Sequence, residues 1–170
     1  MSHLRNYLIP LQKEMEYHRI VVPSLFPTNN KVLVWGRHSR SHNVRQIHEM
    51  VRICSLIKPL PYPDAYRWDW EGCHLKSKRV GYRWFMNRWN KSVLGLKKPP
   101  RAGTHTVIEL HTLMDGRIHV HVHSVRARLT DEDGVSCKAL VDGLTHAGFF
   151  PDDRREFVAG VTQSQEKLSR

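Results

Sequence analysis

Residues 105–129 read HTVIELHTLMDGRIHVHVHSVRARL, and their two stretches of alternating side chains predict a pair of β-strands. We expect the strands at 105–113 and 118–129, with a turn at Asp115-Gly116. A loop of about three residues would bring the histidines of both strands onto one face, whereas a type I′ turn of about two would mix the faces. Polarity favours the longer loop, which leaves the opposite face to Ile108, Leu110, Val120 and Val122.

The histidines of the second strand alternate as His119, His121 and His123, so they share one face. Imidazole is a common zinc ligand, which makes a zinc site one hypothesis. However, the chain lacks the close cysteine pairs of a structural zinc site, and three histidines on one strand seldom converge on one ion. A half-exposed polar sheet face, beside DNA or at a dimer interface, is the favoured interpretation.

Before this pair, β-rich residues 17–22 predict a strand, and prolines and asparagines at 23–30 predict a loop. Apolar residues at helical spacing then predict an amphipathic helix over 41–58, which ends at a run of prolines. After the pair we expect a helix at 135–147 with Gly148 at its C-terminal cap, a last strand at 156–161, and a frayed tail from about residue 163. The predicted fold is a single α+β domain, residues 1–170, with a small mixed or antiparallel sheet packed against two main helices.

The chain has 170 residues and a formal net charge of +11, which favours nucleic acid as a partner over an anionic membrane surface. No apolar run approaches the ~18 residues of a membrane span, and the N-terminal residues do not resemble a secretory signal. The cysteines, Cys54, Cys73 and Cys137, form no CxxC pair, which is typical of a reduced cytoplasmic compartment.

Between Lys76 and Arg101 the sequence holds nine lysines and arginines, no acidic residue, and several interleaved aromatic residues. Cations contact phosphates and aromatic rings stack on unpaired bases, so one interpretation is a nucleic-acid surface. The other is a helix whose aromatic side chains lie in the core while its cationic face is solvated, and the two can hold together. The candidate DNA contacts are Lys76, Lys78, Arg79, Arg83, Arg88, Lys97 and Lys98.

An acid-rich block, DEDGVSCKALVDGLTHAGFFPDD, occupies residues 131–153 of this otherwise basic chain. Clustered carboxylates are the ligands that Mg²⁺ prefers, and Mg²⁺ can activate the water that hydrolyses a phosphodiester. Structural interpretations remain open at each position. Asp133 could cap a helix, Lys138 and Asp142 could form an ordinary i,i+4 pair, and the last two aspartates could shape a turn.

The block runs Asp-x-Asp, lysine, Asp-Gly-Leu-Thr-His-Ala-Gly and Asp-Asp, and this order resembles the RusA-type Holliday-junction resolvases of bacteria and prophages. Residues 20–31, IVVPSLFPTNNK, resemble the opening strand and Pro-Ser-Asn-Asn loop of the same family. Gly134 stands where the family usually has asparagine, the lysine lies about one residue further on, and residues 63–103 have no counterpart and are treated as a basic aromatic insertion.

The resemblance implies a RusA-like fold, a homodimer, and a Mg²⁺-dependent endodeoxyribonuclease, with Mn²⁺ as an alternative metal, that resolves four-way DNA junctions by paired nicks. It implies catalytic roles for Asp131, Asp133, Lys138 and Asp153. The implied metal ligands are Asp131, Asp133, Asp152 and Asp153, and the loop residues Asn29 and Asn30 would face the DNA. The alternatives are a catalytically inactive DNA-binding protein of the same fold and a basic RNA-binding protein. Metal-dependent cleavage and preference for four-way junctions separate the three.

Overall fold

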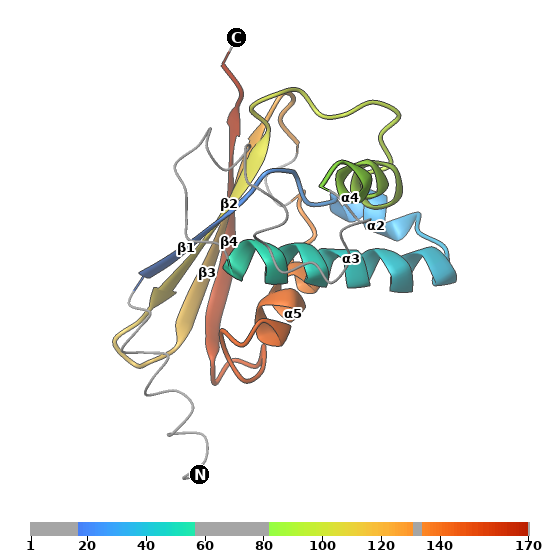
Figure 1. Ribbon diagram of the computed structural model, residues 1–170. Helices are drawn as coiled ribbons and strands as arrows, with labels where there is room; N and C mark the ends of the chain where they lie inside the picture. Colours follow the sequence, from blue (N-terminus) through green and yellow to red (C-terminus); the bar gives the residue numbers. More distant parts are fainter. Residues whose placement is uncertain (1–16, 57–81, 131–133, 170) are drawn as a thin grey trace.

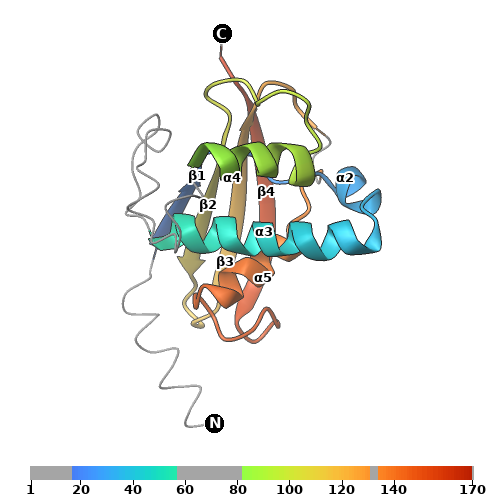
Figure 2. The same ribbon diagram turned by 45° about the vertical axis from the view of Figure 1, so that its right-hand side comes forward.

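The computed structural model describes residues 17–56, 82–130 and 134–169, which form an α+β fold with helices packed on one face of a sheet (Figures 1 and 2). Its four strands follow chain order: β1 (Tyr17–Val22), β2 (His105–Thr112), β3 (Ile118–Arg126) and β4 (Val158–Lys167). The first three strands are antiparallel, and β4 is parallel to β3. The predicted α+β class with a mixed sheet is confirmed.

The hairpin of β2 and β3 has the register that polarity favoured. Glu109 pairs with His121 and His111 with His119, so the polar faces of the two strands coincide. The Leu113 amide donates to the Arg117 carbonyl at 2.8 Å, which leaves three residues, 114–116, in the loop. Gly116 closes the loop with a φ of 86°, a conformation that glycine adopts at low cost. The opposite face is fully buried at Ile108, Leu110, Val120 and Val122.

The helices are α2 (Asn29–Leu33), α3 (Arg37–Leu56), α4 (Tyr82–Arg88), which continues into a π-helical turn (Trp89–Val93), and α5 (Lys138–His146). Helix α3 begins four residues before the predicted position 41, and residues 57–58 lie outside the described residues. Its first turn is closed by the Arg40 amide, which donates to the Gly36 carbonyl at 2.8 Å. Residues 37–41 are exposed, so this turn lacks the apolar periodicity from which a helix is predicted in a sequence.

Two predicted boundaries near the C-terminus are wrong. Helix α5 begins at Lys138 rather than residue 135, because Val135 forms a β-bridge with Thr28. Strand β4 continues to Lys167, so the expected end at 161 and the frayed tail from about 163 are replaced by ordered strand. Residues 163–167 pair with 122–126 of β3. Gly148 does end α5, with a φ of 90°.

The basic aromatic segment contributes side chains to the core. Trp89 is 0% exposed, its Nε1 donates to the Leu25 carbonyl at 3.1 Å, and its ring meets the Phe26 ring edge-on. Phe85 is buried beside it. These two rings are therefore not available to stack on bases, whereas the side chains of Tyr82 and Trp84 lie outside the described residues. None of the described helices combines the length and the apolar character that crossing a membrane requires.

Candidate metal and nucleic-acid site

The asparagine loop and the acidic block, about a hundred residues apart in sequence, lie side by side. Thr28 forms an antiparallel bridge with Val135. The Asn29 amide donates to the Gly134 carbonyl at 2.7 Å, and the Ser136 amide donates to the Pro27 carbonyl at 2.9 Å. Asn29 and Asn30 are exposed next to this contact. The fold therefore joins the two segments that carry the family resemblance.

Strand β4 holds the chain on both sides of residues 131–133. The Gln163 side chain accepts from the Val135 amide at 3.2 Å and donates to the Val135 carbonyl at 2.8 Å. The Gln165 side chain bonds the amide and the carbonyl of Thr130 in the same way. We call these two side chains the glutamine pair. Asp131 and Asp133 lie outside the described residues, but the residues that flank them are anchored to the sheet.

Lys138 is the first residue of α5 and is exposed. The ion pairs of the described residues do not include one between Lys138 and Asp142, so the expected alternative of an i,i+4 pair is absent there. The pKa of Asp153 is raised by a hydrogen bond with Asp152 and by desolvation, and to a lesser extent by the charge of Asp142, one turn further along α5. The chain after α5 thus returns Asp153 toward the helix face that carries Asp142, one turn from Lys138.

The two aspartates after α5 have different environments. A hydrogen bond between their carboxyl groups lowers the pKa of Asp152 and raises that of Asp153. The Nε of Arg154 also donates to Asp152 at 2.7 Å, which lowers the pKa of Asp152 further. No lysine or arginine among the described residues forms an ion pair with Asp153. Of the two, Asp153 is the carboxylate that is open to an added cation.

The described residues contain no group of three histidine, cysteine, aspartate or glutamate side chains that could hold a metal ion. The predicted ligand set needs Asp131 and Asp133, so it stays a prediction. Its chemistry fits Mg²⁺, because every proposed donor is a carboxylate oxygen. Of Asp152 and Asp153, Asp153 fits this role better, because Asp152 already forms an ion pair with Arg154.

The predicted DNA contacts are only partly described. Lys97 and Lys98 are exposed after the π-helical turn. Arg88 is exposed, but its Nε lies 3.1 Å from His42 Nε2 and so links α4 to α3. The side chain of Arg83 is outside the described residues, as are the other three cations, Lys76, Lys78 and Arg79.

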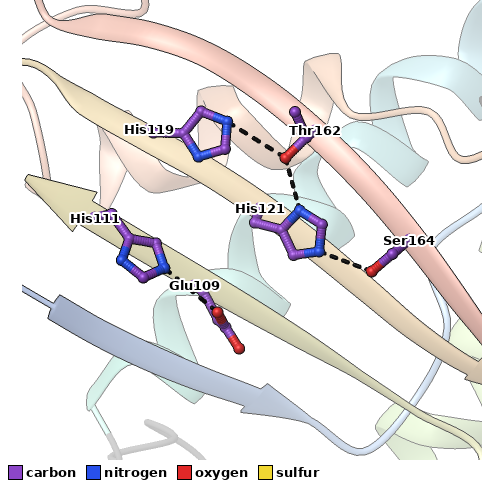
Figure 3. Close-up of polar contacts among 6 residues, drawn as sticks. All are labelled: Glu109, His111, His119, His121, Thr162 and Ser164. Atoms are coloured by element: carbon purple, nitrogen blue, oxygen red, sulfur yellow. Dashed lines mark hydrogen bonds and ion pairs between the residues drawn. The ribbon is translucent and has the colours of Figure 1, made fainter. Parts of the chain in front are cut away.

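The outer face of the sheet carries a network of histidines and hydroxyl groups (Figure 3). His121 is hydrogen-bonded to Thr162 Oγ1 at 2.6 Å and to Ser164 Oγ at 2.7 Å, so both of its ring nitrogens are engaged. His119 also contacts Thr162, at 3.3 Å. Burial lowers the pKa of His121 and favours its neutral form. The face is half-buried and polar, as expected, whereas its place beside DNA or at a dimer interface stays a prediction.

Sequence reasoning missed the glutamine pair. Gln163 and Gln165 fall in the segment that was expected to be a frayed tail, and no motif marks them. Residues 162–166 are all polar, so the alternation of apolar and polar side chains that predicts a half-buried strand is absent there.

Comparison of the chain with models of protein families, with curated proteins and with solved structures finds no match.

Proposed function

We propose that this protein is a Mg²⁺-dependent endodeoxyribonuclease that binds branched DNA and resolves Holliday junctions by paired nicks, as its resemblance to the RusA-type resolvases implies. The observation that carries the proposal is the pairing of residues 27–29 with residues 134–136. It brings the two segments of the resemblance together, and Lys138, the first residue of α5, follows two residues after Ser136.

In the proposed site Asp131, Asp133 and Asp153 hold Mg²⁺, and Asp152 assists from its pair with Arg154. The metal would supply water activation and stabilise the leaving oxygen. Lys138 presents a fixed positive charge to the scissile phosphate, which stabilises the charge that develops on its oxygens. The net charge of +11 supports an anionic polymer as the substrate. A homodimer would place two such sites across one junction.

The test is cleavage of a synthetic four-way junction with and without Mg²⁺, beside a linear duplex of the same arm sequence. Asp131→Asn, Asp133→Asn and Asp153→Asn should each abolish cleavage while retaining junction binding, because they remove metal ligands rather than cationic contacts. Asp115→Asn, in the hairpin turn, removes a carboxylate elsewhere and should cleave normally. Full cleavage by Asp133→Asn would refute the metal assignment.

Lys138 is tested by its effect on rate. If it stabilises the transition state, Lys138→Ala should lower the single-turnover cleavage rate by ~10²-fold or more, with little loss of affinity. A normal rate would return Lys138 to a structural role. Junction binding without cleavage in Mg²⁺ or Mn²⁺ would instead favour the inactive DNA-binding alternative, and tighter binding of RNA would favour the RNA-binding alternative.

A further inference from the structure

A cavity of about 260 Å³ lies beside the asparagine loop, between residues 25–28, α2, the segment after the π-helical turn, and the end of β3. Its apolar wall includes Phe26, Leu94 and Leu96, and its polar residues are Thr28, Lys31 and Arg126. Among the described residues that line it, none is acidic. This described lining is therefore cationic and partly apolar.

Arg126, the last residue of β3, is only 6% exposed. Its Nη2 donates to the Phe26 carbonyl at 3.4 Å, while its Nε is buried and has no hydrogen-bond partner among the residues that the structure describes. None of the ion pairs among the described residues includes it. Arginine stays charged at neutral pH, and a buried charge without an opposite partner is costly. An anion that enters the cavity would remove this cost.

Lys31 supplies the second positive charge. Its side chain lies across Gly95, where an added Cβ would overlap its Cε and Nζ. Gly95 has a φ of 63°, so glycine provides both the backbone conformation and the space that the lysine uses. Two cations from separate elements, α2 and β3, therefore border one cavity.

We infer that this cavity binds a phosphate group of a nucleic-acid strand, through Arg126 and Lys31. A guanidinium group matches the geometry of phosphate oxygens, and the apolar wall suits the sugar attached to that phosphate. The same loop, residues 27–29, contacts residues 134–136 of the acidic block. The assignment of the phosphate to a DNA strand rests on the proposed function, whereas phosphate binding by the cavity does not.

The first arm of the test uses inorganic phosphate and thermal unfolding. Phosphate should raise the Tm of the unmodified protein above its value in chloride at equal ionic strength. Arg126→Met should lose this rise yet fold at least as well in chloride, because it removes an unpaired buried charge. Arg117→Gln removes an equal charge in the hairpin turn, remote from the cavity, and should keep the rise. Lys31→Gln, at a partly exposed position, should also reduce the rise and supplies a second variant.

The second arm measures junction binding in EDTA as salt is varied, so it does not depend on cleavage. The slope of log affinity against log salt is negative, and Arg126→Met should make it less steep by ~0.9, the value for one phosphate contact. Arg117→Gln should leave the slope unchanged. If Arg126→Met loses the rise of Tm in phosphate but binds the junction with an unchanged salt slope, the ligand is free phosphate and the DNA assignment is overturned. A Tm that is equal in phosphate and chloride for the unmodified protein would overturn the site itself. Absence of cleavage in the junction assay would refute the proposed nuclease activity, but the thermal-unfolding and junction-binding measurements could still be interpreted.

Discussion

Asp152 and Asp153 are neighbours in sequence, yet their surroundings give them opposite properties. Asp152 has the Arg154 guanidinium as a partner, and Asp153 has the Asp142 carboxylate near it. A raised carboxyl pKa in a folded protein means that the charged form is less favourable there than in the unfolded chain. For Asp153 the main cause is the hydrogen bond with Asp152, which favours the protonated form of Asp153, and the nearby charge of Asp142 acts in the same direction.

Asp153→Asn should therefore raise the Tm at pH 7, where the unmodified carboxylate is ionised, and have little effect at pH 3. The sign follows from linkage. Because the folded pKa is above the ordinary value of 3.8, the unfolded state binds fewer protons and stability falls as pH rises through this window. Asp115→Asn serves as a control with the opposite expected sign, because hydrogen bonds from Arg117 lower the pKa of Asp115. It should lower the Tm at pH 7. Thermal melts of both variants at the two pH values decide, and a lower Tm for Asp153→Asn at pH 7 would contradict the assignment.

Burial also determines the reactivity of Cys137, whose thiol pKa is raised to about 11. Thiol reagents attack the thiolate, so at pH 8 this cysteine should react at least ~10²-fold more slowly than a free cysteine of pKa near 8.5. Cys54 is fully buried and should be equally inert. The measurement is titration with a coloured disulfide reagent in a Cys73→Ser variant. Reaction only after addition of denaturant is expected, and two rapid equivalents from the native protein would refute it.

At the scale of elements, sequence predicted best where one face of an element is apolar. The β2–β3 register followed from the alternation of Ile108 and Leu110 with Glu109 and His111. Prediction from the sequence failed where an element extends past the core, as in the first turn of α3. It also failed for β4, an edge strand whose far half is polar. The far half of β4 is ordered by long-range pairing with β3, to which local hydrophobicity gives no clue.

The site was predictable as a list of residues but not as an arrangement. Asn29 and the acidic block could be named from their order in the resemblance, whereas their contact depends on the bridge between Thr28 and Val135. Arg126 looked like one more cation of a basic chain, because burial leaves no mark in a single arginine. Tertiary packing, rather than residue type, decides which cations are buried.

The glutamine pair gives a prediction that belongs to β4. Gln163→Met keeps the length of the side chain but removes its hydrogen bonds to the Val135 amide and carbonyl. The free energy of unfolding should therefore fall by about 1–3 kcal/mol. Hydrogen exchange at the Val135 amide should accelerate, and junction cleavage should fall if residues 131–133 need this anchor. Lys167→Met, an exposed position of the same strand, should change none of the three. Unchanged protection of Val135 would show that Gln163 does not hold the segment.

The core lies between the helices and one face of the sheet, and the other face carries partly exposed histidines (Figures 1 and 3). Histidines lie on both sides of this boundary. Burial lowers the pKa of His18, which packs against Phe149, and of His48, at the junction of α3 and α5. It does the same for His105 and for His121 on the outer face. The folded state thus prefers several neutral histidines that the unfolded chain would protonate.

This preference predicts that the protein loses stability on mild acidification. A histidine whose folded pKa lies below the ordinary value of 6.5 binds fewer protons in the folded state, so its contribution is complete above 6.5 and is lost as pH falls below it. Chemical denaturation at constant ionic strength should therefore give a smaller free energy of unfolding at pH 5.5 than at pH 7.5. His18→Leu should narrow that difference, because the His18 Nε2 is buried with no partner in the described part of the chain and leucine has no proton to gain. Phe149→Leu alters the packing on His18 but keeps the titrating ring, so it should lower stability at both pH values and preserve the difference. Equal stability of the unmodified protein at pH 5.5 and pH 7.5 would mean that the buried histidines gain protons as readily in the folded state as in the unfolded one.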